Sequence, residues 1–271
     1  MRFLFLGDVI GRAGRDALIE AVPGLRRDLA LDFIVANGEN AAGGFGITEK
    51  ICGQLFAAGI DVITGGNHSW DQRAIIDYID HERRLLRPIN YPKGTPGKGV
   101  ALFGTAGGRR VLVINAMGRV FMDAIDDPFA AVDAELTRYV LGRDADFILL
   151  DMHGEATSEK VAMGVFADGR ASLVVGSHSH VPTADTRILP GGSGFQTDAG
   201  MCGDYDSVIG MDKEEPLRRF TRKISGGRMN PANGPATICG VFVESDDRSG
   251  LCRRIAPLRD GGVLRPTMPE G

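Results

Sequence analysis

Short apolar runs alternate with amphipathic stretches along the first 80 residues. Three runs have the length and composition of buried strands, at residues 3–6, 32–36 and 61–64. Apolar residues recur at helical spacing over 14–29, where Pro23 predicts a break into two pieces. A second helix is predicted after Thr48, a candidate N-cap, and a third through 75–79. This alternation predicts an α/β fold whose first strands are mainly parallel.

The pattern changes after residue 88. Residues 99–104 and 110–116 read as two strands joined by Gly107-Gly108, which predicts an antiparallel hairpin and therefore mixed sheets. The remaining apolar spacing predicts helices at 128–141, 157–167 and 214–223, and strands at 146–151, 172–175, 186–189, 236–244 and 250–258. No repeat or linker interrupts the chain, so we expect a single domain over residues 1–271, with the last ten or so as a tail.

Composition narrows the classes of partner and location. The chain has 271 residues, 43% hydrophobic, with a net charge of −4, so nothing demands duplex nucleic acid or an anionic membrane as partner. Its N-terminal apolar run is too short for a signal peptide or a membrane span. The four cysteines show no Cys-x-x-Cys spacing, which is typical of reduced thiols. We therefore expect a cytoplasmic protein.

Polar side chains of similar chemistry follow five of the predicted strands. They are Asp8; Glu39 and Asn40; Asn67 and His68; His153; and His178 and His180. Only five histidines occur in the chain, and all except His81 lie at these strand ends. Because ligands of open α/β sheets bind beyond the carboxyl ends of the strands, we expect these groups to meet at one sheet edge.

Each motif alone also has a purely structural interpretation. Asp8 is explained by capping the next helix, Glu39-Asn40 by a turn, and an isolated His153 by an ordinary buried ring. Their recurrence at five strand ends favours a metal site. Carboxylate, amide and imidazole groups without thiolate suit Fe, Mn or Zn better than Ca or Mg. The set exceeds the needs of one ion, and Glu39 could bridge two ions ~3.5–4 Å apart.

The glycines near the N-terminus suggest another hypothesis, a loop that binds the phosphates of a dinucleotide. Gly7, Gly11 and Gly14 follow a predicted strand and open a helix, as in a dinucleotide-binding loop. Their spacing is Gly-x3-Gly-x2-Gly and not Gly-x-Gly-x-x-Gly, which disfavours that interpretation. Arg12 or the helix N–H groups could still meet a phosphate oxygen.

The strand-end motifs together resemble those of the calcineurin-like metallophosphoesterases. The motifs are Gly7-Asp8, Asn37-Gly38-Glu39-Asn40, Gly66-Asn67-His68, His153 and Gly176-Ser177-His178-Ser179-His180. Within that superfamily they resemble the YmdB-type 2′,3′-cyclic-nucleotide 2′-phosphodiesterases over residues 3–243. Two of these motifs depart from the broad superfamily pattern: Asp8-Val9-Ile10 replaces Asp-x-His, and Asn37-Gly38-Glu39-Asn40 replaces the usual Gly-Asp motif. This branch shares both departures. Gly203-Asp204 stands where the branch is expected to have Gly-Pro.

The resemblance implies a fold and a metal assignment. The implied fold is a four-layer αββα sandwich of two mixed β-sheets flanked by helices. The implied cofactors are two di- or trivalent metal ions, with iron favoured over manganese or zinc. The implied ligands are Asp8, Glu39, Asn40 and His180 for one ion, and Glu39, Asn67, His153 and His178 for the other. His68 is implied to be the general acid.

The resemblance also implies a reaction. A metal-bound hydroxide would open 2′,3′-cyclic nucleotides to 3′-nucleotides while His68 protonates the departing 2′ oxygen; RNA with cyclic ends is a further candidate substrate. Expected substrate contacts are Arg12, Thr157, Ser158 and Tyr205, and self-association is expected through 87–96 or 214–233. Two alternatives stay open: a broader phosphomonoesterase or RNA-end phosphatase, and a metal-dependent regulatory nucleotide-binding module with incidental hydrolysis.

Overall fold

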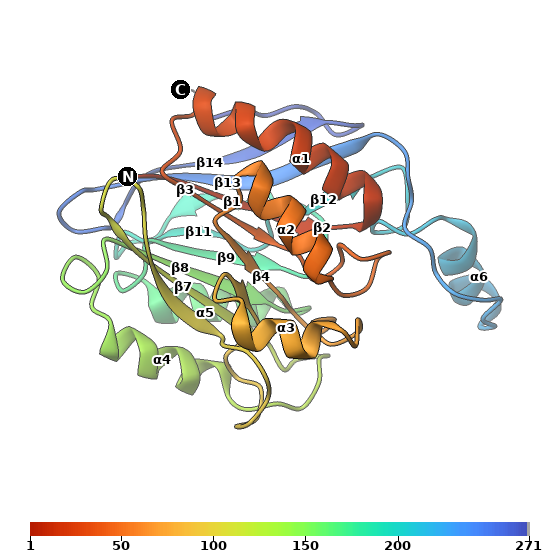
Figure 1. The fold of residues 1–271 in the computed structure, drawn as a ribbon, viewed down its shortest axis with the longest axis horizontal. Coiled ribbons are helices and arrows are strands. Elements are labelled where there is room, and N and C mark those ends of the chain that lie inside the picture. Colours follow the sequence, from red (N-terminus) through yellow and green to blue (C-terminus); the bar gives the residue numbers. More distant parts are fainter. Residues whose placement is uncertain (270–271) are drawn as a thin grey trace.

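Two mixed β-sheets pack face to face and helices cover their outer faces (Figure 1). The computed structural model describes residues 1–269. Within them are the helices α1 (Gly11–Asp28), α2 (Glu49–Ala58), α3 (Ile75–His81), α4 (Pro128–Arg138), α5 (Thr157–Ala167) and α6 (Glu214–Arg222). The first three pack on one sheet, α4 and α5 pack on the other, and α6 projects from the body. This arrangement confirms the expected αββα sandwich.

The first sheet has the strand order β2-β12-β13-β1-β3-β4-β5, with β14 paired to β13. Its strands are β1 (Arg2–Leu6), β2 (Asp8–Val9), β3 (Phe33–Asn37), β4 (Val62–Thr64), β5 (Leu85–Leu86), β12 (Met201–Asp204), β13 (Ala236–Ser245) and β14 (Cys252–Gly261). Strands β1, β3, β4 and β5 run parallel, as the alternation of apolar runs predicted, while β13 runs antiparallel to β1.

The second sheet has the order β10-β11-β9-β8-β7-β6. Its strands are β6 (Val100–Gly104), β7 (Arg110–Met117), β8 (Phe147–His153), β9 (Leu173–Ser177), β10 (Arg187–Ile188) and β11 (Gly194–Gln196). Strands β7, β8, β9 and β11 are parallel. The predicted hairpin is present as the antiparallel pair β6–β7.

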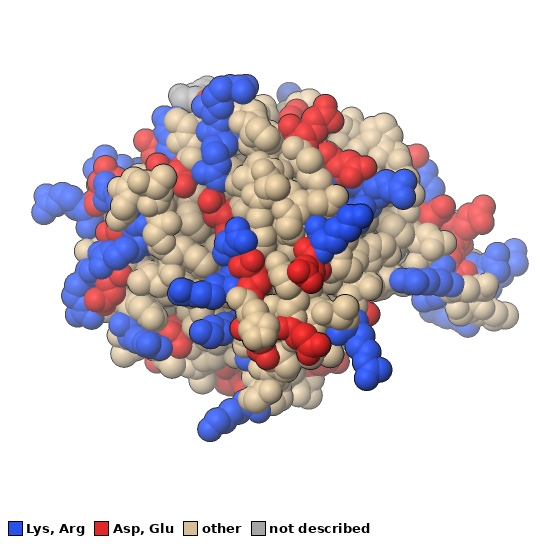
Figure 2. All heavy atoms as spheres, viewed as in Figure 1, with Lys and Arg blue, Asp and Glu red and all other residues tan. Residues whose placement is uncertain are grey.

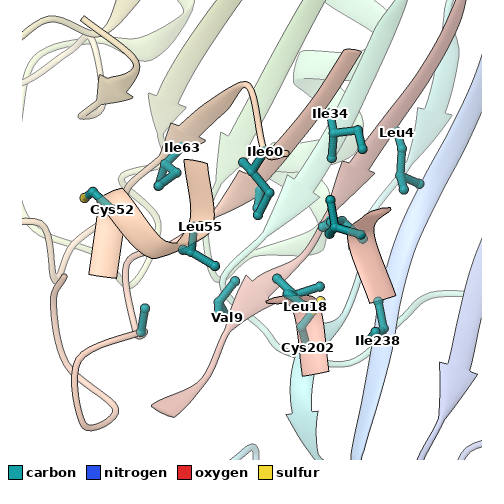
Figure 3. Packing of buried hydrophobic residues seen from close by; sticks show 14 of the residues in the cluster. Leu4, Val9, Leu18, Ile34, Cys52, Leu55, Ile60, Ile63, Cys202 and Ile238 are labelled. Carbon is teal, nitrogen blue, oxygen red and sulfur yellow. The ribbon is translucent and has the colours of Figure 1, made fainter. Parts of the chain in front are cut away.

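Alternation along β1 shows how one strand serves two cores. Leu4 and Leu6 pack against α1 and α2 in a cluster that also holds Leu18 and Leu55 (Figure 3). Phe3 and Phe5 point to the opposite face, between the two sheets. There the ring of Phe3 stacks on Phe147 of β8, with centroids 4.3 Å apart. The two sheets are therefore joined by an apolar layer that continues to the strand ends.

One predicted break and several short strands differ from the sequence pattern. The helix break expected at Pro23 is wrong, because α1 continues through it. Pro23 lies on the exposed face, so the buried stripe of Leu18, Val22 and Leu25 stays continuous and holds the helix on the sheet. The N-cap at Thr48 is confirmed, since its side chain accepts from the backbone of Ile51. Strands β2, β5, β11 and β12 were missed because each has only two to four residues.

None of the helices within residues 1–269 is both long enough and apolar enough to cross a lipid bilayer. The four cysteines are free thiols with buried side chains.

The stack of Phe3 on Phe147 leads to a stability prediction. Phe147 is fully buried between the sheets, so Phe147→Ala should lower the free energy of unfolding by about 3–5 kcal/mol in urea denaturation. Phe121→Ala is the matched control because Phe121 is 87% exposed, and its effect should stay within about 0.5 kcal/mol. Equal effects of the two substitutions would contradict the inter-sheet role of Phe147.

Candidate active site

The polar strand ends of both sheets meet at one end of the sandwich. Asp8 lies in β2, while Glu39 and Asn67 follow β3 and β4 of the first sheet. His153 is the last residue of β8, and His178 follows β9 of the second sheet. The expectation of a single sheet edge was therefore wrong. Two facing sheets contribute, because the apolar layer between them brings their carboxyl ends together.

Two groups of candidate metal ligands lie at this junction. The donor atoms of Glu39, His153 and His178 all lie within 4.8 Å of one another, and so do those of Asp8, Glu39 and His180. Glu39 belongs to both groups. The structure thus divides the strand-end residues into two overlapping sets, with one carboxylate in common.

Two amide side chains extend these groups. Asn67 Oδ1 lies 2.9 Å from His153 Nε2. Asn40 Nδ2 lies 3.1 Å from Glu39 Oε1 and 3.2 Å from His180 Nε2. Half a turn of the Asn40 amide would place its oxygen at the same point. All seven residues expected to bind metal are therefore gathered into the cluster, with Asn40 beside one group and Asn67 beside the other.

Burial sets the charge balance of the cluster. Burial raises the pKa of Asp8 to about 7, even though His180 and His153 act in the opposite direction. Burial also acts to raise the pKa of Glu39, but the charge and hydrogen bond of His153 bring it down to about 2. For His153, burial is outweighed by the negative charge and hydrogen bond of Glu39, which raise its pKa to about 9. The carboxylates thus draw positive charge into the site, as a bound cation would provide.

Two histidine rings have their tautomers set by neighbours outside the cluster. His180 Nδ1 donates to the carbonyl of Ile209 at 2.8 Å, which leaves Nε2 as the lone-pair nitrogen toward Asn40. His153 Nδ1 lies 2.9 Å from Ser177 Oγ. In both cases Nε2 faces the cluster and can act as a metal ligand.

His178 presents its other nitrogen to the cluster. Its Nδ1 lies 3.1 Å from His153 Nε2, and its Nε2 lies 3.3 Å from a carboxylate oxygen of Glu155. Burial, followed by the nearby charge of His153, lowers the pKa of His178 to about 3. A ring held neutral in this way has a free lone pair for a metal ion.

The segment that carries His178 and His180 has an unusual backbone. Their backbone φ angles are 93° and 64°, a region that residues other than Gly rarely adopt. Between them, Ser179 donates from its N–H and its hydroxyl to Asp198, at 3.1 and 2.7 Å. The same Asp198 oxygen accepts from Lys160 Nζ at 2.7 Å, and both charged side chains are buried. A buried ion pair therefore holds the strained segment in place.

Gly66 allows the two sheets to approach at the cluster. A Cβ atom at this position would lie 2.2 Å from Glu39 Oε2 and 2.3 Å from His153 Nε2. No side chain can be accommodated there without moving donor groups, so the sequence needs Gly immediately before Asn67.

His68 lies beside the cluster and is oriented by an acid. Its backbone N–H donates to Glu39 Oε2 at 3.1 Å, and its ring Nδ1 lies 2.8 Å from Asp71 Oδ2. The edge of its ring meets Phe45, with centroids 5.1 Å apart. Because Asp71 engages Nδ1, Nε2 is the nitrogen left for proton transfer.

A cavity of about 450 Å³ opens over the cluster. It is lined by Glu39, Asn40, Gly44, Phe45, His68, Glu155, His178, Ser179, His180, Val208, Ile209, Met211, Pro216, Arg219, Phe220 and Met229. This lining includes four of the candidate metal ligands and His68, together with apolar side chains and Arg219 from residues 208–229. The cavity can therefore take a ligand with a polar end and an apolar part.

The four expected substrate contacts are not among the residues that line this cavity. Arg12 is exposed in α1, and Thr157 and Ser158 are exposed at the start of α5. The hydroxyl of Tyr205 accepts from the N–H of Met201 at 2.8 Å and donates to the carbonyl of His180 at 3.0 Å. Tyr205 thus supports the His180 segment, and a direct contact of any of the four with substrate stays a prediction.

The sequence interpretation missed a buried network around Asp151. Asp151 accepts hydrogen bonds from Ser177 Oγ and Thr64 Oγ1, both at 2.6 Å, and from Asn37 Nδ2 at 3.2 Å. Because Ser177 also contacts His153, the network fixes that ring from behind. A signal was present: Asp151 interrupts an apolar strand two residues before His153, so both side chains share one face.

Comparisons with known proteins place this geometry in context. A family model described as YmdB-like protein matches residues 4–258. The 2′,3′-cyclic-nucleotide 2′-phosphodiesterase of Bacillus subtilis (strain 168) is 47% identical over 249 residues, 92% of this chain and 93% of that protein. The crystal structure of a hypothetical protein from Thermus thermophilus is 40% identical, with a TM-score of 0.90 over 97% of this chain and 100% of its own. The structure of a novel phosphatase from Mycoplasma pneumoniae is 32% identical, with a TM-score of 0.89 over 96% and 93%.

The shared carboxylate gives a prediction about metal content. Glu39→Gln keeps the shape of the side chain but removes the charge common to both donor groups, so metal at both should fall. Metal analysis by mass spectrometry after loading with Fe or Mn should show about two ions per wild-type chain and clearly fewer in the variant. Glu20→Gln, in the exposed face of α1, is the control and should match the wild type. Full metal content in Glu39→Gln would contradict the assignment.

The buried pair of Lys160 and Asp198 gives a second prediction. Lys160→Met would leave the Asp198 carboxylate buried without its cation, so the free energy of unfolding should fall by about 3–5 kcal/mol. Urea denaturation measures the loss, and Lys50→Met, at an exposed position, should change stability by no more than about 0.5 kcal/mol. An unchanged free energy of unfolding in Lys160→Met would show that the ion pair does not hold the 178–180 segment.

Proposed function

This chain belongs to the YmdB-like family, and on that premise we propose that it is a metal-dependent phosphodiesterase that hydrolyses 2′,3′-cyclic nucleotides to 3′-nucleotides. The observation that carries the proposal is the pair of donor groups that share Glu39 on the cavity wall beside His68. The name of the 47% identical Bacillus subtilis relative supports the choice of substrate and of the bond that is cleaved.

The residues present fit two metal ions. Asp8, Glu39, Asn40 and His180 would hold one ion, and Glu39, Asn67, His153 and His178 the other. The donor set contains only oxygen and nitrogen atoms, and imidazole makes iron, manganese or zinc better suited than calcium; we favour iron. Bound there, the ions would supply positive charge to the phosphoryl oxygens and make a water molecule more acidic.

His68 would supply the proton for the leaving group. Water contributes the oxygen of the new P–O bond, the bond from phosphorus to the 2′ oxygen breaks, and that oxygen takes a proton from His68. The product is a 3′-phosphate with a free 2′ hydroxyl. One proton of the water stays on the new phosphoryl oxygen, and the proton that the water loses restores the imidazole, directly or through solvent. Asp71 on Nδ1 keeps Nε2 available for this transfer.

The apolar side of the cavity would orient the rest of the substrate. With the cyclic phosphate at the donor groups, the nucleobase would meet the side formed by Ile209, Met211 and Phe220. Contacts of this kind are tolerant of base identity, because every base offers a flat apolar face. The cavity therefore supports recognition of a nucleotide through its phosphate end and its ring plane.

Phosphomonoester hydrolysis is a second candidate. The structure from Mycoplasma pneumoniae, 32% identical, is described as a phosphatase, and a phosphomonoester would present the same phosphoryl oxygens to the two donor groups. A panel of 2′,3′-cAMP, 2′-AMP and 3′-AMP, with products separated by chromatography, distinguishes the two activities. Accumulation of 3′-AMP favours the diesterase, whereas release of inorganic phosphate from 3′-AMP favours the phosphatase.

The oriented imidazole gives a prediction that also separates catalysis from simple nucleotide binding. His68→Ala removes the proton donor but none of the proposed metal ligands, so turnover of 2′,3′-cAMP should fall by ~10²–10⁴-fold while metal content is unchanged. His81→Ala, at the exposed end of α3, is the control and should retain full activity. Wild-type turnover in His68→Ala would remove this residue from the mechanism. Absence of 3′-AMP formation by the iron- or manganese-loaded wild type would overturn the proposed function.

A further inference from the structure

Helix α6 and the loop after it project from the body as an arm, residues 213–229 (Figure 1, right). The base of the arm is closed by a backbone hydrogen bond from Asp212 to Asn230 at 2.8 Å and by pairing of Met211 with Pro231. Residues 220–228 are all exposed, so almost nothing in the described chain covers the end of the arm.

The arm holds its own shape through Glu215. Its carboxylate accepts from Arg219 Nε at 2.8 Å, from Ser225 Oγ at 3.2 Å and from the N–H of Gly226 at 3.0 Å. Arg219 also donates to the carbonyl of Gly227 at 2.7 Å. These bonds tie the helix to the loop that follows it, so the exposed side chains are displayed on an internally bonded unit.

The charge of the arm is opposite to that of the rest of the chain. It contains six Lys or Arg residues and two Glu, a local charge of +4, whereas the whole chain carries −4, so the remaining residues carry −8. Lys213 pairs with Asp206, and Arg219 pairs with Glu215. Within residues 1–269, no carboxylate lies within ion-pair distance of the other four, which are Arg218, Arg222, Lys223 and Arg228. Figure 2 shows the basic side chains on this projecting part of the surface.

The arm is continuous with the candidate active site. Pro216, Arg219, Phe220 and Met229 line the same cavity as His68. Phe220 is also 71% exposed, so its ring reaches from the cavity to the outer surface. Aromatic rings placed beside cations are the usual elements of surfaces that bind single-stranded nucleic acid, where bases stack and phosphates meet the positive charges.

We propose that the arm binds the strand that leads into the site, so that the substrate class includes single-stranded oligoribonucleotides ending in a 2′,3′-cyclic phosphate. This inference rests on the proposed function. A cyclic mononucleotide carries a single negative charge, which the donor groups and their ions would engage, and it leaves the unpaired cations of the arm unused. An oligoribonucleotide carries one additional phosphate for each upstream nucleotide, and these phosphates would meet the unpaired cations of the arm.

The bound strand must be RNA, and the end that carries the cyclic phosphate must enter the cavity. Only a ribose with both hydroxyls can form the cyclic phosphate, and the reaction is the one given above: one water is consumed, the bond to the 2′ oxygen breaks, and a 3′-phosphate remains on the strand. A second copy of this chain, whose residues outside the arm carry −8, is the competing occupant, and sedimentation of the arm variant distinguishes it from RNA.

Kinetics with matched substrates tests the inference. The metal-loaded full chain would be given 2′,3′-cAMP and an octaribonucleotide ending in adenosine 2′,3′-cyclic phosphate. We expect kcat/KM for the octamer to exceed that for 2′,3′-cAMP by about tenfold or more at low salt, and to decline as salt rises. In the triple variant R218Q/R222Q/K223Q this advantage should disappear and the salt slope should decrease by about 2, with turnover of 2′,3′-cAMP within about twofold of wild type.

A matched control removes the same charge elsewhere. The variant R27Q/R83Q/R138Q changes three exposed side chains on or just after α1, α3 and α4 and should behave as wild type with both substrates. Equal effects of the two triple variants on the octamer would overturn the role of the arm while leaving the proposed function intact. So would sedimentation showing that R218Q/R222Q/K223Q dissociates a wild-type oligomer, because the arm would then be a self-association surface. Failure of the wild type to hydrolyse 2′,3′-cAMP would instead overturn the proposed function.

Discussion

The concentration of negative charge at the junction of the two sheets is the constraint on which the site depends. Asp8 and Glu39 are buried with almost no access to water, and the imidazole of His153 lies 3.2 Å from Glu39 Oε1 and 4.0 Å from Asp8 Oδ1. Buried carboxylates are costly unless they are paired or bind a cation. The seven converging donors, the preset ring tautomers and the missing side chain at Gly66 all serve one result, a polar pocket made for cations inside an apolar sandwich.

The fold keeps this pocket in place by supporting it from behind. The Asp151 network holds His153 on β8, and the ion pair of Lys160 with Asp198 holds the backbone between His178 and His180. Asp151 lies in β8 of the second sheet and Lys160 in α5 on its outer face, whereas Asp8 and Glu39 come from the first sheet. Thr64 and Asn37 of the first sheet reach Asp151 across the junction. Packing between the sheets, including Phe3 on Phe147, is therefore what sets the distance between the two halves of the donor set.

The side of the cavity opposite the donors is built differently. It comes from loop residues and from α6, which buries only Pro216. The chemistry that we propose thus uses buried, strand-anchored residues, and the recognition that we propose uses an exposed and cationic projection. This division places a basic surface beside the site of a chain whose net charge is −4, because residues 213–229 hold six Lys or Arg and two Glu, a local charge of +4.

The sequence alone determined the layering, the parallel start of the first sheet, the β6–β7 hairpin and the identity of the polar strand ends, because these follow from local periodicity and turn residues. The family resemblance implied separate roles for His68 and its neighbour Asn67, and these roles stay a prediction. Only the tertiary structure decided that two sheets share the site, that α1 continues through Pro23, and that Asp151 and Lys160 support the residues of the site. These outcomes depend on contacts between residues far apart in the chain, and on which face of an element is buried. Neither is visible in the local pattern of residues.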